Sequence, residues 1–282
     1  MKHGLVLEGG GMRCLYTSGI LDVFMENGIT FDGMIGVSAG ATFGCNFKSR
    51  QIGRALRYNK KFASHPMYCS VRSLIKTGDL VNKQVAYREV PIQHDPFDFE
   101  TFVNNPMEFH VVCTDVNTGE PVYKVLKEGT VTDFLDWVQA SASMPLVSNA
   151  VEKEGHLMLD GGISNSIPLE HFQQEGYERN VVILTQPKGF FKKRTKLVPL
   201  FRLFHKYPKI TEAMARRHEM YNSQLRYLQQ EELKGNTLVI YPEQTLAIGR
   251  AEMNPEKMEH IYAMGRRKGE EVLQQVKDFL KA

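Results

Sequence analysis

The chain has 282 residues, 42% of them hydrophobic, which is enough to bury a full core as one large domain. Its 35 basic and 32 acidic residues leave a net charge of +3, which argues against a dedicated nucleic-acid-binding protein. No run of 18 apolar residues is present to span a membrane, and the first strand begins too early to leave room for a signal peptide.

Short apolar runs alternate with longer amphipathic stretches, a pattern typical of strands and helices in an α/β fold. In chain order the pattern predicts strand 4–7, helix 13–26, strand 34–37, a helix from 39, hairpin strands 109–113 and 121–125, helix 131–141, a strand ending at 160, helix 169–175, strands 181–184 and 237–241, and helix 255–280. Residues 60–105 are predicted to be irregular, with helices that frame a pocket. We expect a mostly parallel sheet covered on both faces, with the site at the carboxyl ends of its strands.

One serine stands where a catalytic nucleophile is typically found. Residues 36–40 read Gly-Val-Ser-Ala-Gly, the G-x-S-x-G pattern of a nucleophile elbow. Gly36 and Gly40 leave room for a tight turn, and a helix that begins after Ser38 directs free N–H groups toward its hydroxyl. From this pentapeptide alone, an ordinary glycine-rich turn is an equal alternative.

A glycine run follows the first predicted strand. Residues 9–11 are all glycine, so the backbone can adopt positive φ and bring its N–H groups close to an oxyanion. A Walker loop would require Gly-Lys-Ser/Thr, whereas Gly11 is followed by Met12-Arg13. A dinucleotide fingerprint would require a third glycine where Cys14 stands. Both kinds of phosphate-binding loop are therefore disfavoured.

A third motif, Asp160-Gly161-Gly162, completes a resemblance to a known family. The three motifs in this order resemble the patatin-like phospholipases, whose pattern is G-G-G-x-R/K, then G-x-S-x-G, then D-G-G/A. The resemblance covers roughly residues 4–185. It implies a three-layer α/β/α lipid acyl hydrolase that uses a Ser–Asp dyad, with no histidine, no cofactor and no catalytic metal.

The resemblance also assigns roles to residues. Ser38 is expected to be the nucleophile and Asp160 its general base. The oxyanion hole is expected from the backbone N–H groups of Gly9, Gly10, Gly11 and Met12. The supporting residues are Arg13, Gly36, Gly40, Gly161 and Gly162, with Arg13 holding the glycine loop in place. The chain departs from many family members at Cys14, where they carry a further glycine, and we expect only local packing to change.

Two alternatives concern the catalytic partner of Ser38. A D-G-G turn is a common way to end a strand, so Asp160 considered alone is more often structural. With the other two motifs present, a carboxylate whose pKa is raised by burial can act as the base. A Ser–Asp–His triad would need a histidine on a loop after a strand. The four histidines after Asp160 lack that context, and they are His171, His205, His218 and His260.

Basic and aromatic residues are concentrated in residues 188–217. This stretch has ten Lys/Arg against one acid, Glu212, with interleaved phenylalanines. Such a composition suits a lid or a segment that docks on anionic lipid headgroups. A solvated basic loop whose phenylalanines pack on the core is the alternative. We expect a cytoplasmic location, peripheral to the inner face of the membrane, and the four cysteines suit reduced thiols there.

These inferences define the expected organisation and function. Residues 1–185 are expected to form the patatin-like core, 186–235 a basic and aromatic helical segment, and 236–282 a final strand and helix that complete the same domain. The predicted activity is hydrolysis of lipid carboxylic esters through an acyl-enzyme on Ser38, with a phospholipid or other lipid ester as substrate and no nucleic acid as partner. An acyltransferase with the same dyad and a catalytically silent lipid-binding module are the alternatives.

Overall fold

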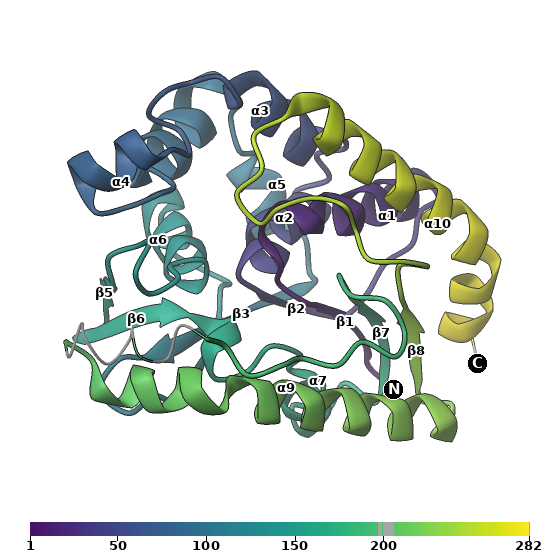
Figure 1. Cartoon of the computed structure of the whole chain (residues 1–282). Helices are drawn as coiled ribbons and strands as arrows, with labels where there is room; N and C mark the ends of the chain where they lie inside the picture. The colour runs from purple at the N-terminus through teal and green to yellow at the C-terminus, as the bar shows by residue number, and fades with distance from the viewer. Residues whose placement is uncertain (197–198, 200–205, 282) are drawn as a thin grey trace.

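A mixed eight-stranded sheet forms the centre of the molecule (Figure 1). The computed structural model describes residues 1–196, 199 and 206–281. The strand order is β5-β6-β3-β2-β1-β7-β8, with β4 also paired to β3. The strands are β1 (His3–Leu7), β2 (Gly33–Val37), β3 (Glu108–Asp115), β4 (Pro121–Val125), β5 (Val151–Lys153), β6 (His156–Asp160), β7 (Arg179–Ile183) and β8 (Thr237–Ile240).

Parallel pairing dominates the half of the sheet that carries the glycine loop and Ser38. β1 pairs in parallel with β2 and β7, β2 with β3, and β7 with β8. The pairs β3–β4, β3–β6 and β5–β6 are antiparallel. The predicted α/β architecture with a mostly parallel sheet is therefore confirmed, with an antiparallel portion at one side.

Helices cover both faces of this sheet (Figure 1). Helices α1, α2 and α10 lie on one face, and α7 and α9 lie on the other. The α-helices are α1 (Cys14–Glu26), α2 (Ala39–Lys48), α3 (Arg54–Phe62), α4 (Val71–Thr77), α5 (Phe99–Asn104), α6 (Val131–Ser141), α7 (Leu169–Gln174), α9 (Pro208–Lys234) and α10 (Pro255–Lys281). Two 3-10 turns, η1 (Gly11–Arg13) and η3 (Gly161–Ile163), and a π-helix, η2 (Val85–His94), complete the described elements.

Alternation along the strands divides the core between the two faces. Leu5 and Leu7 of β1 pack into the cluster that includes α1, α2 and α10, whereas Val6 faces the cluster that includes α7 and α9. Successive side chains of a strand point to opposite faces, so a continuous apolar run of this kind is expected where both faces are covered.

The C-terminal region is joined closely to the rest of the molecule. β8 extends the sheet beside β7, and α10 crosses α1 at very short range. A Cβ atom at Gly265 of α10 would lie 2.0 Å from the carbonyl oxygen of Tyr16 in α1, and one at Gly19 would lie 2.3 Å from that of Tyr262. The two backbones approach this closely because glycine has no side chain to separate them. The predicted helical C-terminal region is thus confirmed.

The structure differs from the sequence-based expectation in two stretches. Residues 60–105 contain α4, η2 and α5 and are less irregular than predicted. β5 was not predicted, and it forms a hairpin with β6 through Glu154 and Gly155, which have φ angles of 53° and 79°. Two consecutive left-handed residues make the turn type that matches the twist of a hairpin. No helix among the described residues is both long and apolar enough to cross a bilayer.

Candidate active site

Ser38 lies in a strained turn between β2 and α2. Its φ and ψ are 56° and −128°, a sparsely populated conformation for a residue with a side chain. A Cβ atom at Gly40 would lie 2.7 Å from the carbonyl oxygen of Leu7, so the turn requires glycine there. Backbone strain of this kind often accompanies function, and here it projects the serine from a strand end.

The sheet register brings Asp160 to the same level as Ser38. Val37 pairs with Val112 of β3, and Asp160 pairs with the next residue, Cys113. The Asp160 side chain is buried, with 2% of the residue exposed. Its Oδ1 accepts a hydrogen bond of 2.8 Å from the Gly162 N–H, whereas Oδ2 is buried without a hydrogen-bond partner among the described residues. One carboxylate oxygen is therefore held and the other is unengaged.

Burial and neighbouring groups have opposite effects on the pKa of Asp160. Burial raises its pKa, and the Ser38 hydroxyl, the positive charges of Arg217 and Arg250 and the Gly162 N–H lower it, with a net upward shift. The Ser38 hydroxyl is thus near enough to influence the carboxylate, although no hydrogen bond of standard length and angle joins them. Such catalytic hydrogen bonds are often long until substrate binds.

Ser141 holds the backbone of the turn in place. Its Oγ accepts a hydrogen bond of 2.9 Å from the Ser38 N–H and donates one of 2.6 Å to the Val112 carbonyl oxygen. This side chain is fully buried at the end of α6. No local motif predicts this contact, because 103 residues separate Ser38 from Ser141.

The glycine loop packs against the chain near Arg250. Gly11 has a φ of 60°, and a Cβ atom there would lie 2.3 Å from the Arg250 carbonyl oxygen. The Met12 N–H donates to that same oxygen at 3.0 Å. Met12 was expected to contribute to the oxyanion hole, but its N–H is engaged elsewhere. Within the described part of the chain, no hydrogen bond occupies the N–H groups of Gly10 and Gly11.

Other contacts fix the loop and add a donor. The Arg13 Nε donates a hydrogen bond of 3.3 Å to the Gly10 carbonyl oxygen. Thr185, which follows β7, donates from its hydroxyl to the Gly9 carbonyl oxygen at 3.1 Å. The Ala39 N–H, at the first turn of α2, has no hydrogen-bond partner among the described residues and lines the same cavity as Ser38. A free N–H directly after the nucleophile is therefore a further candidate donor to the oxyanion.

Ser38, the glycine loop and Asp160 all line a cavity of about 520 Å³. Much of its remaining lining is apolar or aromatic. That part includes Phe43, Tyr58, Leu80, Val81, Tyr87, Val90, Phe97, Phe134, Leu135 and Val138. Of the helices between residues 60 and 105, η2 contributes to this wall, together with connecting residues such as Leu80 and Phe97. A polar site joined to an apolar cavity can hold an acyl chain beside a nucleophile.

Sequence comparison identifies the family. Residues 5–172, more than half of the chain, match the model of the patatin-like phospholipases. The chain belongs to this family. Residues 207–281 match a second model, described as a domain of unknown function (DUF6363).

Several curated relatives match part of this chain. The uncharacterized protein YjjU of Escherichia coli K12 is 28% identical over 196 residues, which is 67% of this chain and 54% of YjjU. The neuropathy target esterase sws of Drosophila melanogaster is 26% identical over 182 residues, 64% of this chain and 12% of the relative. The chain thus spans about half or less of these relatives' length. Among solved structures, VipD from Legionella pneumophila aligns over 97% of this chain and 67% of its own, with a TM-score of 0.48 and 12% identity.

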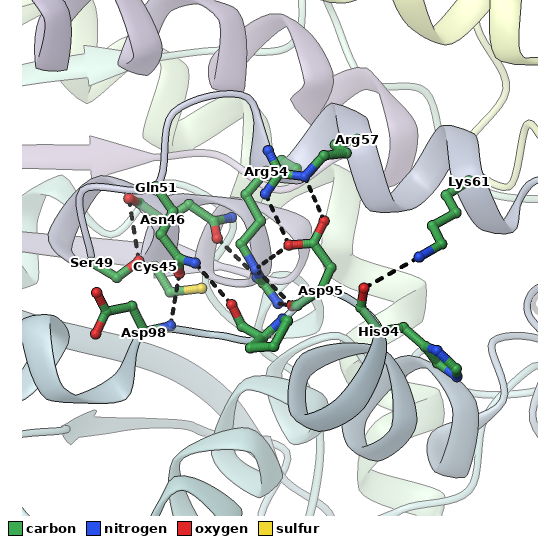
Figure 2. A network of polar contacts seen from close by, with 12 residues as sticks. Cys45, Asn46, Ser49, Gln51, Arg54, Arg57, Lys61, His94, Asp95 and Asp98 are labelled. Carbon is green, nitrogen blue, oxygen red and sulfur yellow. Dashed lines mark hydrogen bonds and ion pairs between the residues drawn. The ribbon is translucent and has the colours of Figure 1, made fainter.

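A buried polar network supports the patatin-like part next to the cavity (Figure 2). The Arg54 guanidinium donates to the Asp95 carbonyl and to Asn46 Oδ1, and it forms an ion pair of 3.4 Å with the Asp95 carboxylate. Arg57 joins the same carboxylate at 2.7 Å. These bonds tie α2 and α3 to the end of η2. Arg54 also lines the cavity, but its charge is already paired.

Two of the histidines considered for a triad, His171 and His260, do not line the cavity. His171 stacks on Tyr123, with ring centroids 3.4 Å apart, and His260 lies in α10. His218 lines the cavity from α9, and His205 lies outside the described residues. Among the described residues, no group of three or more His, Cys, Asp or Glu side chains is placed to hold a metal ion.

Proposed function

We propose that the protein hydrolyses carboxylic esters of lipids through an acyl-enzyme on Ser38, with Asp160 as general base. The observation that carries the proposal is the position of a strained serine beside a buried aspartate whose Oδ2 is unengaged, in one cavity with the glycine loop. Membership in the patatin-like phospholipases supports the same chemistry.

The reaction begins when the Ser38 Oγ attacks the ester carbonyl carbon. As the new C–O bond forms, the hydroxyl proton passes to the Asp160 carboxylate. The oxyanion is stabilised by the free N–H groups of Gly10 and Gly11, with Ala39 as a third donor. One such donor contributes about 2.7–4 kcal/mol to transition-state stabilisation in other hydrolases.

The intermediate collapses when the bond to the leaving alcohol breaks, and that alcohol takes the proton from Asp160. Water then attacks the acyl-enzyme, with Asp160 accepting its proton. That proton returns to the Ser38 Oγ as the fatty acid departs. The raised pKa of Asp160 suits both directions of transfer, since a base too weakly basic would not accept the serine proton.

Residues 188–217 belong to the same proposal as a membrane-docking element. Phe191 is 65% exposed next to the cavity-lining Lys192 and Lys193. Phe201 and Phe204, which the sequence also indicated for this role, lie outside the described residues. An apolar side chain flanked by cations is suited to the headgroup region of an anionic membrane. We expect the protein to act at the cytoplasmic face of such a membrane.

The proposed nucleophile is tested with a fluorophosphonate probe and a short-chain p-nitrophenyl ester. The wild-type protein is expected to be labelled and to release p-nitrophenol, and Ser38→Ala is expected to lose both. Ser148→Ala is the matched control, because Ser148 lines the same cavity and has no proposed role. Labelling that persists in Ser38→Ala would refute the assignment, and an unlabelled, inactive wild-type protein would favour a silent lipid-binding module.

A further inference from the structure

Cationic side chains line the cavity in excess. Among the described residues, five of these cations have no carboxylate partner, and they are Arg13, Lys192, Lys193, Arg217 and Arg250. Two carboxylates of the same described part of the chain, Glu8 and Asp160, line the cavity with them. Arg54 is left out of this balance because it is paired with Asp95. With all of these side chains ionised, five cations against two carboxylates leave an excess of three positive charges at the cavity.

The existing contacts of these cations do not neutralise them. Arg217 donates to the Gly162 carbonyl oxygen, and the Lys192 ammonium lies 3.9 Å from the centroid of the Tyr221 ring. The nearby carboxylate of Glu8 instead accepts hydrogen bonds from the Tyr221 hydroxyl at 2.6 Å and from Thr185. In the described parts of the chain, no ion pair joins Lys192, Arg217 or Arg250 to an acid.

Three separate elements bring these cations together. Lys192 follows β7, Arg217 lies in α9, and Arg250 lies between β8 and α10. All three fall outside residues 5–172, which match the patatin-like model, and two fall within residues 207–281, the domain of unknown function. The excess charge at the cavity is therefore largely a contribution of the C-terminal region.

We propose that Lys192, Arg217 and Arg250 form an anion subsite that binds the phosphate of a lipid headgroup beside Ser38. The identity of the ligand as a lipid rests on the proposed function, whereas the affinity for phosphate does not. Guanidinium groups bind phosphate oxygens through paired, charge-assisted hydrogen bonds, and an ammonium adds a point charge.

The electrostatics of the cluster support this role. Burial lowers the pKa of Lys192 to about 7, and the positive charge of Arg217 is the next contribution in the same direction, followed by those of Arg250 and Arg13, while Glu8 opposes them. Burial and the charges of Arg217 and Arg13 also lower the pKa of Arg250. The cations thus repel one another, and an anion bound among them relieves that repulsion.

The sign of the cluster also predicts which headgroups are preferred. The headgroup of phosphatidylglycerol contains no cation beside its phosphate, so its net negative charge is attracted to the cluster. The quaternary ammonium of phosphatidylcholine is repelled by the same cations that attract its phosphate. The subsite therefore selects anionic over zwitterionic phospholipids.

Binding to an inactive protein tests the subsite independently of catalysis. In the Ser38→Ala background, calorimetry compares dihexanoyl-phosphatidylglycerol, dihexanoyl-phosphatidylcholine and inorganic phosphate. We expect the anionic lipid to bind about tenfold or more tightly than the zwitterionic one, and inorganic phosphate to compete with it. Equal affinity for the two lipids would overturn the proposal. Binding of inorganic phosphate without binding of the anionic lipid would overturn the headgroup assignment.

Two substitutions locate the binding site. Lys192→Gln and Arg250→Gln, each added to Ser38→Ala, are expected to reduce the preference for the anionic lipid about tenfold. Lys127→Gln is the control, because it removes the same charge from a residue that lies outside residues 188–217 and does not line the cavity. An equal loss in Lys127→Gln would refute the assignment to the cluster.

The outcomes separate the two proposals. Charge-selective binding in Ser38→Ala together with an inactive wild-type protein would reject the hydrolase and retain the subsite. Esterase activity without charge-selective binding would retain the hydrolase and reject the subsite.

Discussion

Asp160 is a buried, ionisable residue with one unengaged oxygen, and such a residue lowers the free energy of unfolding instead of raising it. A buried carboxylate loses hydration, which is why its pKa lies above the ordinary value. The Gly162 N–H satisfies Oδ1 only. A residue kept at a cost to folding is expected to serve function, so removing its charge should increase stability and abolish activity.

Asp160→Asn tests this trade-off, since asparagine can still accept the Gly162 N–H bond. The pKa of Asp160 is raised in the folded state, so its ionisation opposes folding at neutral pH. That penalty disappears as the pH falls below the pKa that the same carboxyl has in the unfolded chain. We expect Asp160→Asn to be more stable at pH 7 by roughly 0.5–2 kcal/mol in chemical denaturation, with the gap closing in acid. A less stable, active variant would contradict the assignment.

The same carboxylate is expected to control the acid limb of the pH profile. Asp160 must be ionised to accept the serine proton, so kcat/KM for a neutral ester should rise as pH passes through its raised pKa. Arg217 and Arg250 both lower that pKa, and removing one charge with Arg250→Gln should shift the limb to higher pH. Lys127→Gln, at a residue that neither lines the cavity nor belongs to residues 188–217, should leave the limb in place.

At the level of single residues, the sequence identifies candidate catalytic residues that belong to a short, fixed motif. Ser38 and the glycine run belong to short motifs whose geometry depends on adjacent residues, and a pattern can report them. Ser141 and Arg250 act through contacts with residues more than 100 positions away, at Ser38 and Met12. No local pattern encodes such contacts, so only the folded structure reveals them.

Elements around the cavity depend on a few buried polar contacts as well as on apolar packing. The Arg54 and Asp95 side chains are 5% and 8% exposed and link α3 to the end of η2 (Figure 2). Removing one partner of a buried ion pair leaves the other charge uncompensated, whereas an exposed pair contributes little. This network is therefore expected to determine the stability of the cavity wall.

Asp95→Ala should lower the free energy of unfolding by about 3–5 kcal/mol, measured by urea denaturation. Arg57→Gln, which removes a bond from a side chain that is 55% exposed, is the matched control, and we expect a loss of no more than about 1 kcal/mol. Similar losses in the two variants would show that the network does not depend on the buried pair.

The sequence predicted some helices and strands more accurately than others. Strands and helices with a clear apolar period, such as α6 and β2, lie where the sequence placed them, within one residue. β5 was missed because its two-residue turn uses Glu154 in a left-handed conformation, which sequence rules reserve for Gly, Asn and Asp. For α9 the sequence indicated only a helical segment, because its buried positions are sparse and basic residues separate them.

Over the whole molecule, the close contact of α10 with α1 joins the C-terminal region to the patatin-like part. The contact depends on Gly265 and Gly19, where a Cβ atom would enter the space of a backbone carbonyl. Backbone atoms cannot move aside as flexible side chains can. The joint between the two regions is therefore expected to tolerate no added volume.

Gly265→Ala should lower stability by about 1–3 kcal/mol, because the added methyl group forces the helices apart. Gly249→Ala is the control, since its methyl group would meet no atom closer than 3.9 Å. Thermal unfolding followed by circular dichroism measures both. Unchanged stability in Gly265→Ala would show that the crossing of α10 over α1 adapts more freely than the structure indicates.

The hydrogen bond from the Met12 N–H to the Arg250 carbonyl has a consequence for the order in which the protein becomes functional during synthesis. The glycine loop leaves the ribosome well before the segment around Arg250, and domains begin to fold as they emerge. The segment that braces this loop is thus synthesised more than 200 residues after it. A nascent chain carries its serine before the loop opposite it is supported, and competence to attack an ester is delayed until the residues around Arg250 have been made.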